Sequence, residues 1–141
     1  QPFSVEYQDE SDGVTIEVPR IAFAQALTNL LENAREAQQA IGSNAPIRIH
    51  LSKESGMGIV QITDHGIGLP NQKDQVGEPF FTTKSTGTGL GVYVARAVAQ
   101  GAGGGLGYDS PGDHVTVASW WFPEVTRRAS NVLQPETGEE T

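Results

Sequence analysis

The sequence contains no cysteine, and this absence excludes several kinds of chemistry at once. Without cysteine the chain has no disulfide framework, no thiol nucleophile and no thiolate metal site. The absence is consistent with a reducing compartment. Any catalytic or binding site must therefore be built from carboxylates, amides, hydroxyls, imidazoles, ammonium groups or the backbone.

Long apolar runs and basic clusters are also missing. No stretch approaches the length of a membrane span, and no signal peptide opens the chain. The 9 Lys and Arg residues are outnumbered by 17 Asp and Glu residues, for a net charge of −8. Such a surface repels nucleic acid and anionic lipid. We therefore expect neither nucleic acid nor a membrane as a direct partner of this domain, and we expect a cytoplasmic location.

What is present predicts one α+β domain over residues 1–126, followed by a polar tail at 127–141 that we expect to be disordered. The chain begins at Gln1 rather than Met, which favours a fragment of a longer protein. The order of elements is strands, helix, hairpin, long loop, helix, hairpin. That order predicts a two-layer sandwich, with a mixed sheet under helices, and not a doubly wound fold.

Apolar periodicity places the individual elements. Two helices are expected, at 21–41 with an apolar stripe that ends at Ile41, and at 92–99 with a stripe that includes Val94 and Val98. Alternation of apolar and polar residues predicts six strands, of which the first two form a hairpin or two edge strands. The predicted strands cover residues 3–7, 14–18, 47–52, 59–63, 106–108 and 115–122.

A glycine-rich loop runs directly into the second helix, with glycine at positions 87, 89 and 91. Such a loop presents bare backbone N–H groups and the positive end of a helix dipole, which suits a phosphate. A P-loop would need Lys after the glycines, and a dinucleotide fingerprint would need a strand immediately before them. Neither is present.

Two asparagines on the first helix, Asn29 and Asn33, lie four residues apart and so share one face beside the apolar stripe. Asn is a middling helix former, so the pair needs a reason. It could be solvated or make capping hydrogen bonds. Alternatively, its amide oxygens could belong to a Mg²⁺ site that is completed by water and substrate phosphates.

Asp64 follows an apolar strand and precedes Gly66 and Gly68. A carboxylate there can accept a hydrogen bond from a flat ligand that slides across bare backbone. The same residues also make a common turn, so the pattern by itself leaves both interpretations open.

The long polar stretch from Asp64 to Thr86 has the character of a loop that covers a site. Its paired aromatics, Phe80 and Phe81, must pack on something when the loop closes. Lys84, which follows them, could reach a phosphate.

The asparagine pair, the Asp64 turn, the paired aromatics and the glycine loop occur in the order and spacing of four motifs in a known family. They resemble the N, G1, F and G2 boxes of the ATP-binding catalytic domain of sensor histidine kinases. That domain belongs to the superfamily of type II topoisomerases, mismatch-repair ATPases and the heat-shock chaperone. The sequences of residues 78–84 and 87–91 are most similar to those of histidine kinases of the nitrogen-regulation and redox-responsive kind. The resemblance implies a Bergerat-type fold, ATP and Mg²⁺ as cofactors, and transfer of the γ-phosphate to a histidine.

The resemblance also implies a role for each matching residue. Asn33 would be the Mg²⁺ ligand and a catalytic residue, with Asn29 close by. Asp64 would take the adenine amino group, and Thr116 would contact adenine through water. Gly66 and Gly68 would let the base approach, and Lys84, the second catalytic residue, would neutralise phosphate charge. Phe80 and Phe81 would anchor the lid. The remaining nucleotide-binding positions are Phe80, Thr83, Gly87, Thr88, Gly89, Leu90 and Gly91.

Two positions depart from the family pattern. Many relatives carry a basic residue three positions after the Mg²⁺-binding Asn, where this chain has Glu36 beside Arg35. The hydrolytic members often place a Glu four residues before that Asn, where this chain has Asn29. An amide cannot serve as the base for water, which favours transfer to a nucleophile over hydrolysis.

The nucleophile itself is missing, because His50, His65 and His114 all lie outside helical context. We therefore expect the acceptor histidine on a separate dimerisation domain, in the same polypeptide or a dimer partner, with a response regulator as an indirect partner. This domain would then lie in the cytoplasm, either in a cytoplasmic protein or as the cytoplasmic part of a membrane-anchored sensor. Three alternatives remain: a serine protein kinase like the anti-sigma-factor kinases, an ATP-driven conformational module, and a non-catalytic domain that binds nucleotide or protein.

Overall fold

The computed structural model describes residues 4–68 and 90–125. Two helices and five strands make up these ranges, and each element lies close to where periodicity predicts it. Their order along the chain is β1 (Val5–Asp9), α1 (Arg20–Gln39), β2 (Ile47–Glu54), β3 (Met57–Asp64), α2 (Leu90–Gly101), β4 (Gly105–Gly112) and β5 (Val115–Pro123).

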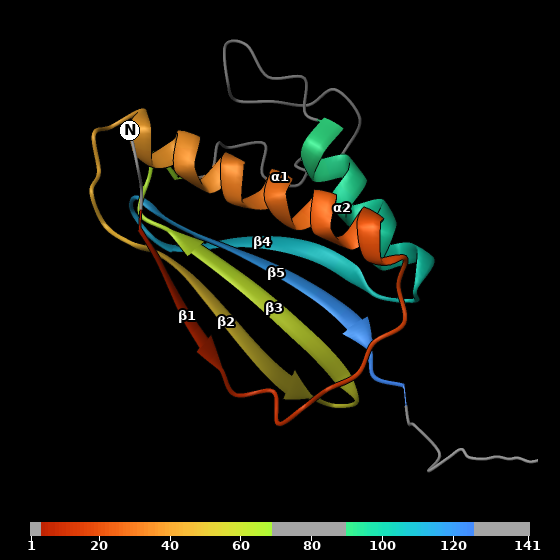
Figure 1. The fold of residues 1–141 in the computed structure, drawn as a ribbon. Helices are drawn as coiled ribbons and strands as arrows, with labels where there is room; N and C mark the ends of the chain where they lie inside the picture. Colours follow the sequence, from red (N-terminus) through yellow and green to blue (C-terminus); the bar gives the residue numbers. More distant parts are fainter. Residues whose placement is uncertain (1–3, 69–89, 126–141) are drawn as a thin grey trace, which may run out of the picture.

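The five strands form one sheet in the order β1-β2-β3-β5-β4. β1 pairs with β2 in parallel, and the other three pairings are antiparallel. Both helices lie over the same face of this sheet (Figure 1). The predicted α+β sandwich, with a mixed and mostly antiparallel sheet, is confirmed.

One predicted strand is wrong. Residues 14–18 form no strand, and β1 pairs with β2 instead of forming a hairpin with them. Their alternation has another cause, because Ile16 and Val18 pack against the core. Val14 lies over β3, where a Cβ at Gly58 would come within 2.7 Å of its Cγ1 atom. Alternation therefore reflects burial of one side of an extended segment, which a segment can achieve without joining a ladder.

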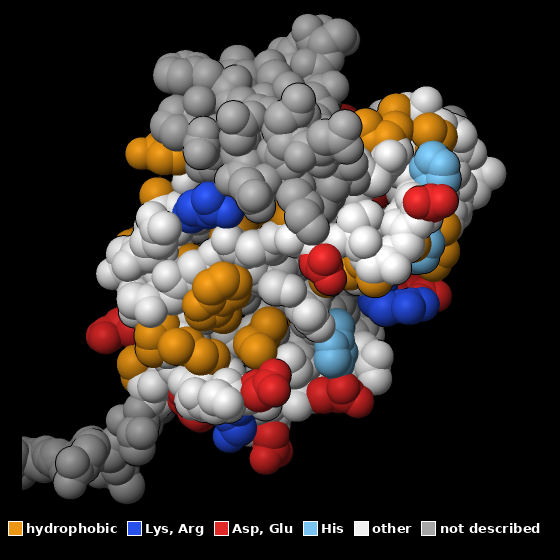
Figure 2. All heavy atoms as spheres, turned by 180° about the vertical axis from the view of Figure 1, so that it is seen from behind, with side chains coloured by type: hydrophobic (Ala, Val, Ile, Leu, Met, Phe, Trp, Pro, Cys, Tyr) orange, Lys and Arg blue, Asp and Glu red, His pale blue; other side chains and the backbone are white. Residues whose placement is uncertain are grey.

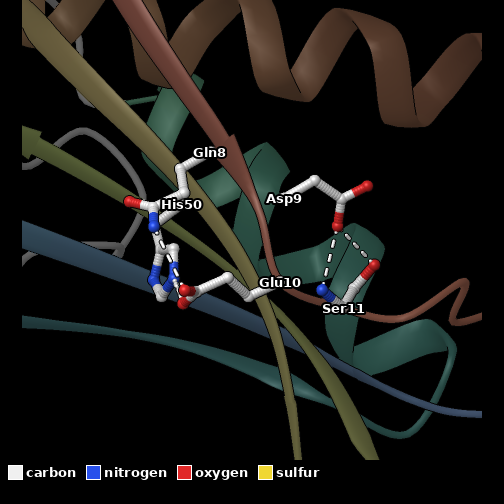
Figure 3. Close-up of polar contacts among 5 residues, drawn as sticks. All are labelled: Gln8, Asp9, Glu10, Ser11 and His50. Carbon is white, nitrogen blue, oxygen red and sulfur yellow. Dashed lines mark hydrogen bonds and ion pairs between the residues drawn. The ribbon is translucent and has the colours of Figure 1, made fainter.

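Hydrogen bonds at the end of β1 turn the chain away from the sheet. Asp9 Oδ1 accepts hydrogen bonds from the backbone N–H of Ser11 at 2.9 Å and from its hydroxyl at 2.6 Å (Figure 3). These bonds lower the pKa of Asp9. Across the same edge, Glu10 lies 2.6 Å from Nε2 of His50 on β2. His50 thus lies on the strand next to the sheet edge and has an acidic partner just beyond the end of β1.

The core lies between the helices and the sheet. Trp120 and Phe122 are fully buried, and Phe23 stacks on Trp120 with ring centroids 4.8 Å apart. The indole N–H of Trp120 donates to the carbonyl of Ala95 at 2.8 Å, so α2 approaches the sheet through its alanines. Among the described residues, the other buried hydrophobic ones are Ala26, Leu30, Ala34, Ile47, Val60, Ile62, Ala95, Ala99, Leu106 and Ala118.

The predicted helical stripes are correct in their middle and wrong at two positions. Ile41 is 46% exposed because α1 ends at Gln39, and Gln38 takes the last buried position of the helix. Val94 is 39% exposed because α2 turns its small residues inward, so that Ala95 is buried.

Seen from behind, hydrophobic side chains reach the surface between acidic ones (Figure 2).

Candidate functional site

A buried carboxylate lies at the end of β3. Asp64 is 6% exposed, and its Oδ1 atom accepts a hydrogen bond from the backbone N–H of Gly66 at 3.0 Å. Burial raises the pKa of Asp64 to about 6, against the lowering effect of that hydrogen bond. Thr116 is its direct neighbour on β5 and is 7% exposed. The structure thus brings together the two residues expected to contact adenine.

The turn after Asp64 is fastened to α1 by backbone contacts. The N–H of Ile67 donates to the carbonyl of Ala37 at 3.2 Å. A Cβ at Gly66 would lie 2.6 Å from the Cβ of Ala37 and closer still to its carbonyl group. Gly66 is therefore required for packing on the helix, and its expected role toward the base stays a prediction.

A buried glutamine adds a side-chain tie to the same turn. Oε1 of Gln38 accepts a hydrogen bond from the N–H of His65 at 2.8 Å. Sequence patterns give little sign of this contact, because a Gln near the end of a helix is ordinarily solvated.

The far side of the turn rests on the β4–β5 connection. Gly68 has φ +82°, a conformation that suits glycine. Nδ1 of His114 donates to the carbonyl of Gly66 at 3.1 Å. His114 is thus a second residue that sequence reasoning left without a role, and it ties the turn to the β4–β5 connection.

The two helices meet where the asparagine motif faces the glycine motif. A Cβ at Gly91 would lie 3.3 Å from the Cβ of Asn29 and 3.7 Å from its amide nitrogen. α2 begins at Leu90, as expected for a glycine loop that enters a helix. The first turn of α2 therefore lies directly against the face of α1 that carries Asn29.

Asn33, one turn further along α1, is hydrogen-bonded through its side chain to Tyr108 on β4. Burial, together with the charge of Asp64, raises the pKa of Tyr108, while Arg96 and this hydrogen bond act in the opposite direction. Arg96 itself donates to the carbonyl of Leu106 at 3.0 Å. Asn33, Asp64 and Tyr108 thus belong to one neighbourhood. Sequence reasoning missed Tyr108, because a tyrosine in an alternating strand is typical of an ordinary core position.

Asn33 offers an amide oxygen of the kind that Mg²⁺ accepts as a ligand. Within residues 4–68 and 90–125, no group of three or more His, Cys, Asp or Glu side chains could hold a metal ion. Mg²⁺ commonly binds through one or two protein oxygens together with water and substrate phosphates. The amide oxygen of Asn33 suits that requirement.

Arg35, which follows Asn33 on α1, forms an ion pair with Glu32, with a nitrogen–oxygen distance of 2.7 Å.

Several predicted site residues lie outside the part of the chain that the structure describes. The same holds for the long loop after Gly68, for the side chain of Leu90 and for the predicted tail at 127–141. The residues concerned are Phe80, Phe81, Thr83, Lys84, Gly87, Thr88 and Gly89.

Comparisons with known proteins agree with this geometry. Residues 19–126 match the family described as "Histidine kinase-, DNA gyrase B-, and HSP90-like ATPase". The sensor histidine kinase ZraS of Escherichia coli strain K12 is 37% identical over 107 residues, which are 74% of this chain and 22% of ZraS. The nitrogen regulation protein NtrY of Azorhizobium caulinodans is 35% identical over 88 residues, which are 59% of this chain and 11% of NtrY.

A solved structure shares the fold. The nucleotide-free catalytic domain of histidine kinase ThkA superposes with a TM-score of 0.69 at 29% identity, covering 85% of this chain and 79% of that one. The chain spans less than a quarter of the length of ZraS or NtrY. Among residues 4–68 and 90–125, neither helix has the length and hydropathy needed to cross a bilayer. The chain belongs to the histidine kinase-, DNA gyrase B- and HSP90-like ATPase family, and its fold is that of a sensor histidine kinase catalytic domain.

Proposed function

We propose that this chain binds Mg·ATP and presents the γ-phosphate to a histidine on a separate phosphoacceptor domain. The observation that carries the proposal is the convergence of three features at one end of the sandwich. Asp64 is buried at the end of β3. Tyr108 is hydrogen-bonded to Asn33 and lies within the electrostatic influence of Asp64, which links the two residues. The first turn of α2 lies against Asn29. A carboxylate, an amide oxygen and a helix N-terminus together suit adenine, a metal ion and phosphate.

Adenine would bind at the end of β3. The carboxylate of Asp64 would accept a hydrogen bond from the exocyclic amino group, and Thr116 would make a water-mediated contact beside it. At neutral pH the pKa of about 6 leaves Asp64 mostly ionised, which strengthens it as a hydrogen-bond acceptor. Gly66 and Gly68 would give the base access to the backbone.

The phosphates would lie over the start of α2. Asn33 would hold Mg²⁺, which when bound neutralises charge on the phosphate oxygens. Backbone N–H groups of the glycine loop and the N-terminus of α2 would contact the phosphates, supported by Lys84. Residues 83, 87, 88 and 89 complete this set in the proposal, and they lie outside the described part of the chain.

Transfer is favoured over hydrolysis by the residue at position 29. Asn29 packs against Gly91 at the place where a base for water would be needed, and an amide cannot accept the proton. None of the three histidines lies in a helix: His50 is in β2, and His65 and His114 are in turns. The acceptor would therefore come from a dimerisation domain of the same polypeptide or its dimer partner, with a response regulator downstream.

The assay that tests the proposal uses γ-labelled ATP, Mg²⁺ and the acceptor domain. We expect label on the acceptor that is lost in acid, since phosphohistidine is acid-labile. An acid-stable product would favour the serine kinase alternative. Robust steady-state ATP hydrolysis by the chain alone would contradict the proposal and favour the ATP-driven conformational module.

A further inference from the structure

Gln38 is a buried polar side chain outside the proposed ligand-binding residues, and both ends of its amide are hydrogen-bonded. It is 3% exposed at the end of the buried stripe of α1, in line with Ala34. Its Nε2 atom donates to the carbonyl of Ala45 at 2.7 Å, and its Oε1 atom accepts from the N–H of His65 at 2.8 Å. Burial of an amide is unfavourable unless both ends are hydrogen-bonded, and here both ends are.

The position of this amide matters because of the atom it holds. The N–H of His65 lies in the peptide that joins Asp64 to residue 65, so the tie acts next to the buried carboxylate. The Asp64 carboxylate is oriented in turn by the N–H of Gly66, at 3.0 Å. A movement of the turn relative to α1 would therefore move the carboxylate with it.

Other contacts of the turn hold different atoms. The N–H of Ile67 bonds the Ala37 carbonyl at the longer distance of 3.2 Å, and His114 holds the Gly66 carbonyl at 3.1 Å. In residues 4–68 and 90–125, Gln38 supplies the side-chain hydrogen bond to the backbone that directly follows Asp64. Loss of the Gln38 amide should affect this turn and the contact with Ala45, while α1 remains held by the core.

We propose that Gln38 is a positioning residue that sets the preference of this site for adenine by fixing the Asp64 turn on α1. The inference rests on the proposed function, since it assumes that Asp64 accepts the adenine amino group. Hydrogen bonds weaken steeply with poor geometry, so a displaced carboxylate loses its contact with the base. Contacts with the phosphates would form at the start of α2, which packs on Asn29, so we expect them to depend less on this turn.

The test compares Gln38→Met with Gln39→Met. Methionine keeps the length of the side chain and removes its hydrogen bonds, and Gln39 is the exposed neighbour on the same helix. Calorimetry with this chain measures Kd for Mg·ATP and for Mg·ITP, whose base carries an oxygen where adenine carries the amino group. We expect Gln38→Met to raise the Kd for Mg·ATP about fivefold and the Kd for Mg·ITP less than about twofold. Gln39→Met should change neither.

The outcomes separate the two levels of the argument. If Gln38→Met leaves the ratio of the Kd values for ATP and ITP unchanged, the residue is structural and the inference is wrong. If wild-type protein binds neither nucleotide, or binds both equally, the adenine site itself is wrong and the inference falls with it. In an Asp64→Asn background, Gln38→Met should cause no further loss of ATP affinity, and an additive loss would overturn the positioning role.

A conservative variant covers the case in which Gln38→Met does not fold. Gln38→Glu keeps the oxygen that accepts from His65 and loses the donor to Ala45. We expect it to retain the ATP-to-ITP ratio of the wild-type protein. A ratio that falls toward one in this variant would contradict the assignment of the His65 contact.

Discussion

Substitution of Gly66 by Ala tests the packing of the Asp64 turn on α1. The added Cβ would lie 2.6 Å from the Cβ of Ala37 and closer to its carbonyl, so the turn must move away from the helix. Overpacking of this kind costs about 1–3 kcal/mol. The movement also weakens two hydrogen bonds, donated by the N–H groups of His65 and Ile67, and their partial loss together adds about 1 kcal/mol. We expect a loss of about 2–4 kcal/mol in the free energy of unfolding.

Urea denaturation measures this loss directly. At an m-value of about 2 kcal/mol/M, the midpoint should fall by about 1–2 M. Gly112→Ala is the matched control, because a Cβ at Gly112 would have nothing within 4 Å, and its midpoint should change little. If Gly66→Ala is as stable as the control but binds ATP weakly, Gly66 serves only the approach of the base, and the packing argument is refuted.

Two further predictions concern the carboxylate and the asparagine. The pKa of Asp64 is raised from 3.8 to about 6 in the folded protein, so the folded state binds its proton more tightly and the free energy of unfolding should fall as pH rises from about 4 to 6. The full penalty above pH 6 is about 3 kcal/mol. Asp64→Asn should remove it, and parallel pH–stability curves for the two proteins would contradict this. Asn33→Ala should abolish Mg²⁺-dependent enhancement of ATP binding, with a smaller loss for Tyr108→Phe, which removes the hydroxyl that is hydrogen-bonded to Asn33. Unchanged Mg²⁺ dependence in Asn33→Ala would refute the metal assignment.

Much of the fold was predictable, because local periodicity and burial agree along most of the chain. The long helix, the two hairpins and the second helix all follow from patterns of 3.6 or 2 residues. The segment at 14–18 shows where this reasoning fails. Its alternation records burial of Val14, Ile16 and Val18, and strand pairing depends on which edge of the sheet is available.

The site was predictable only in part. Asp64, Asn33 and the glycine loop carry residue types and spacings that indicate their chemistry. Gln38, Tyr108 and His114 could not be identified in this way, because each acts across elements that are distant in sequence. Gln38, for instance, bonds His65 across 27 positions of the chain. Such contacts are set by how α1 lies on the sheet, which no local pattern encodes.

The most direct test of the account is a calorimetric titration of Mg·ATP into wild-type protein and Asp64→Asn. We expect saturable binding by the wild type and an affinity lower by about tenfold or more in the variant, as for loss of a hydrogen bond to a charged group. Because Asp64→Asn is expected to be the more stable protein above pH 6, its weaker binding cannot be ascribed to unfolding. Equal affinities for the two proteins, or no saturable binding by the wild type, would contradict the proposal that this site holds ATP through Asp64.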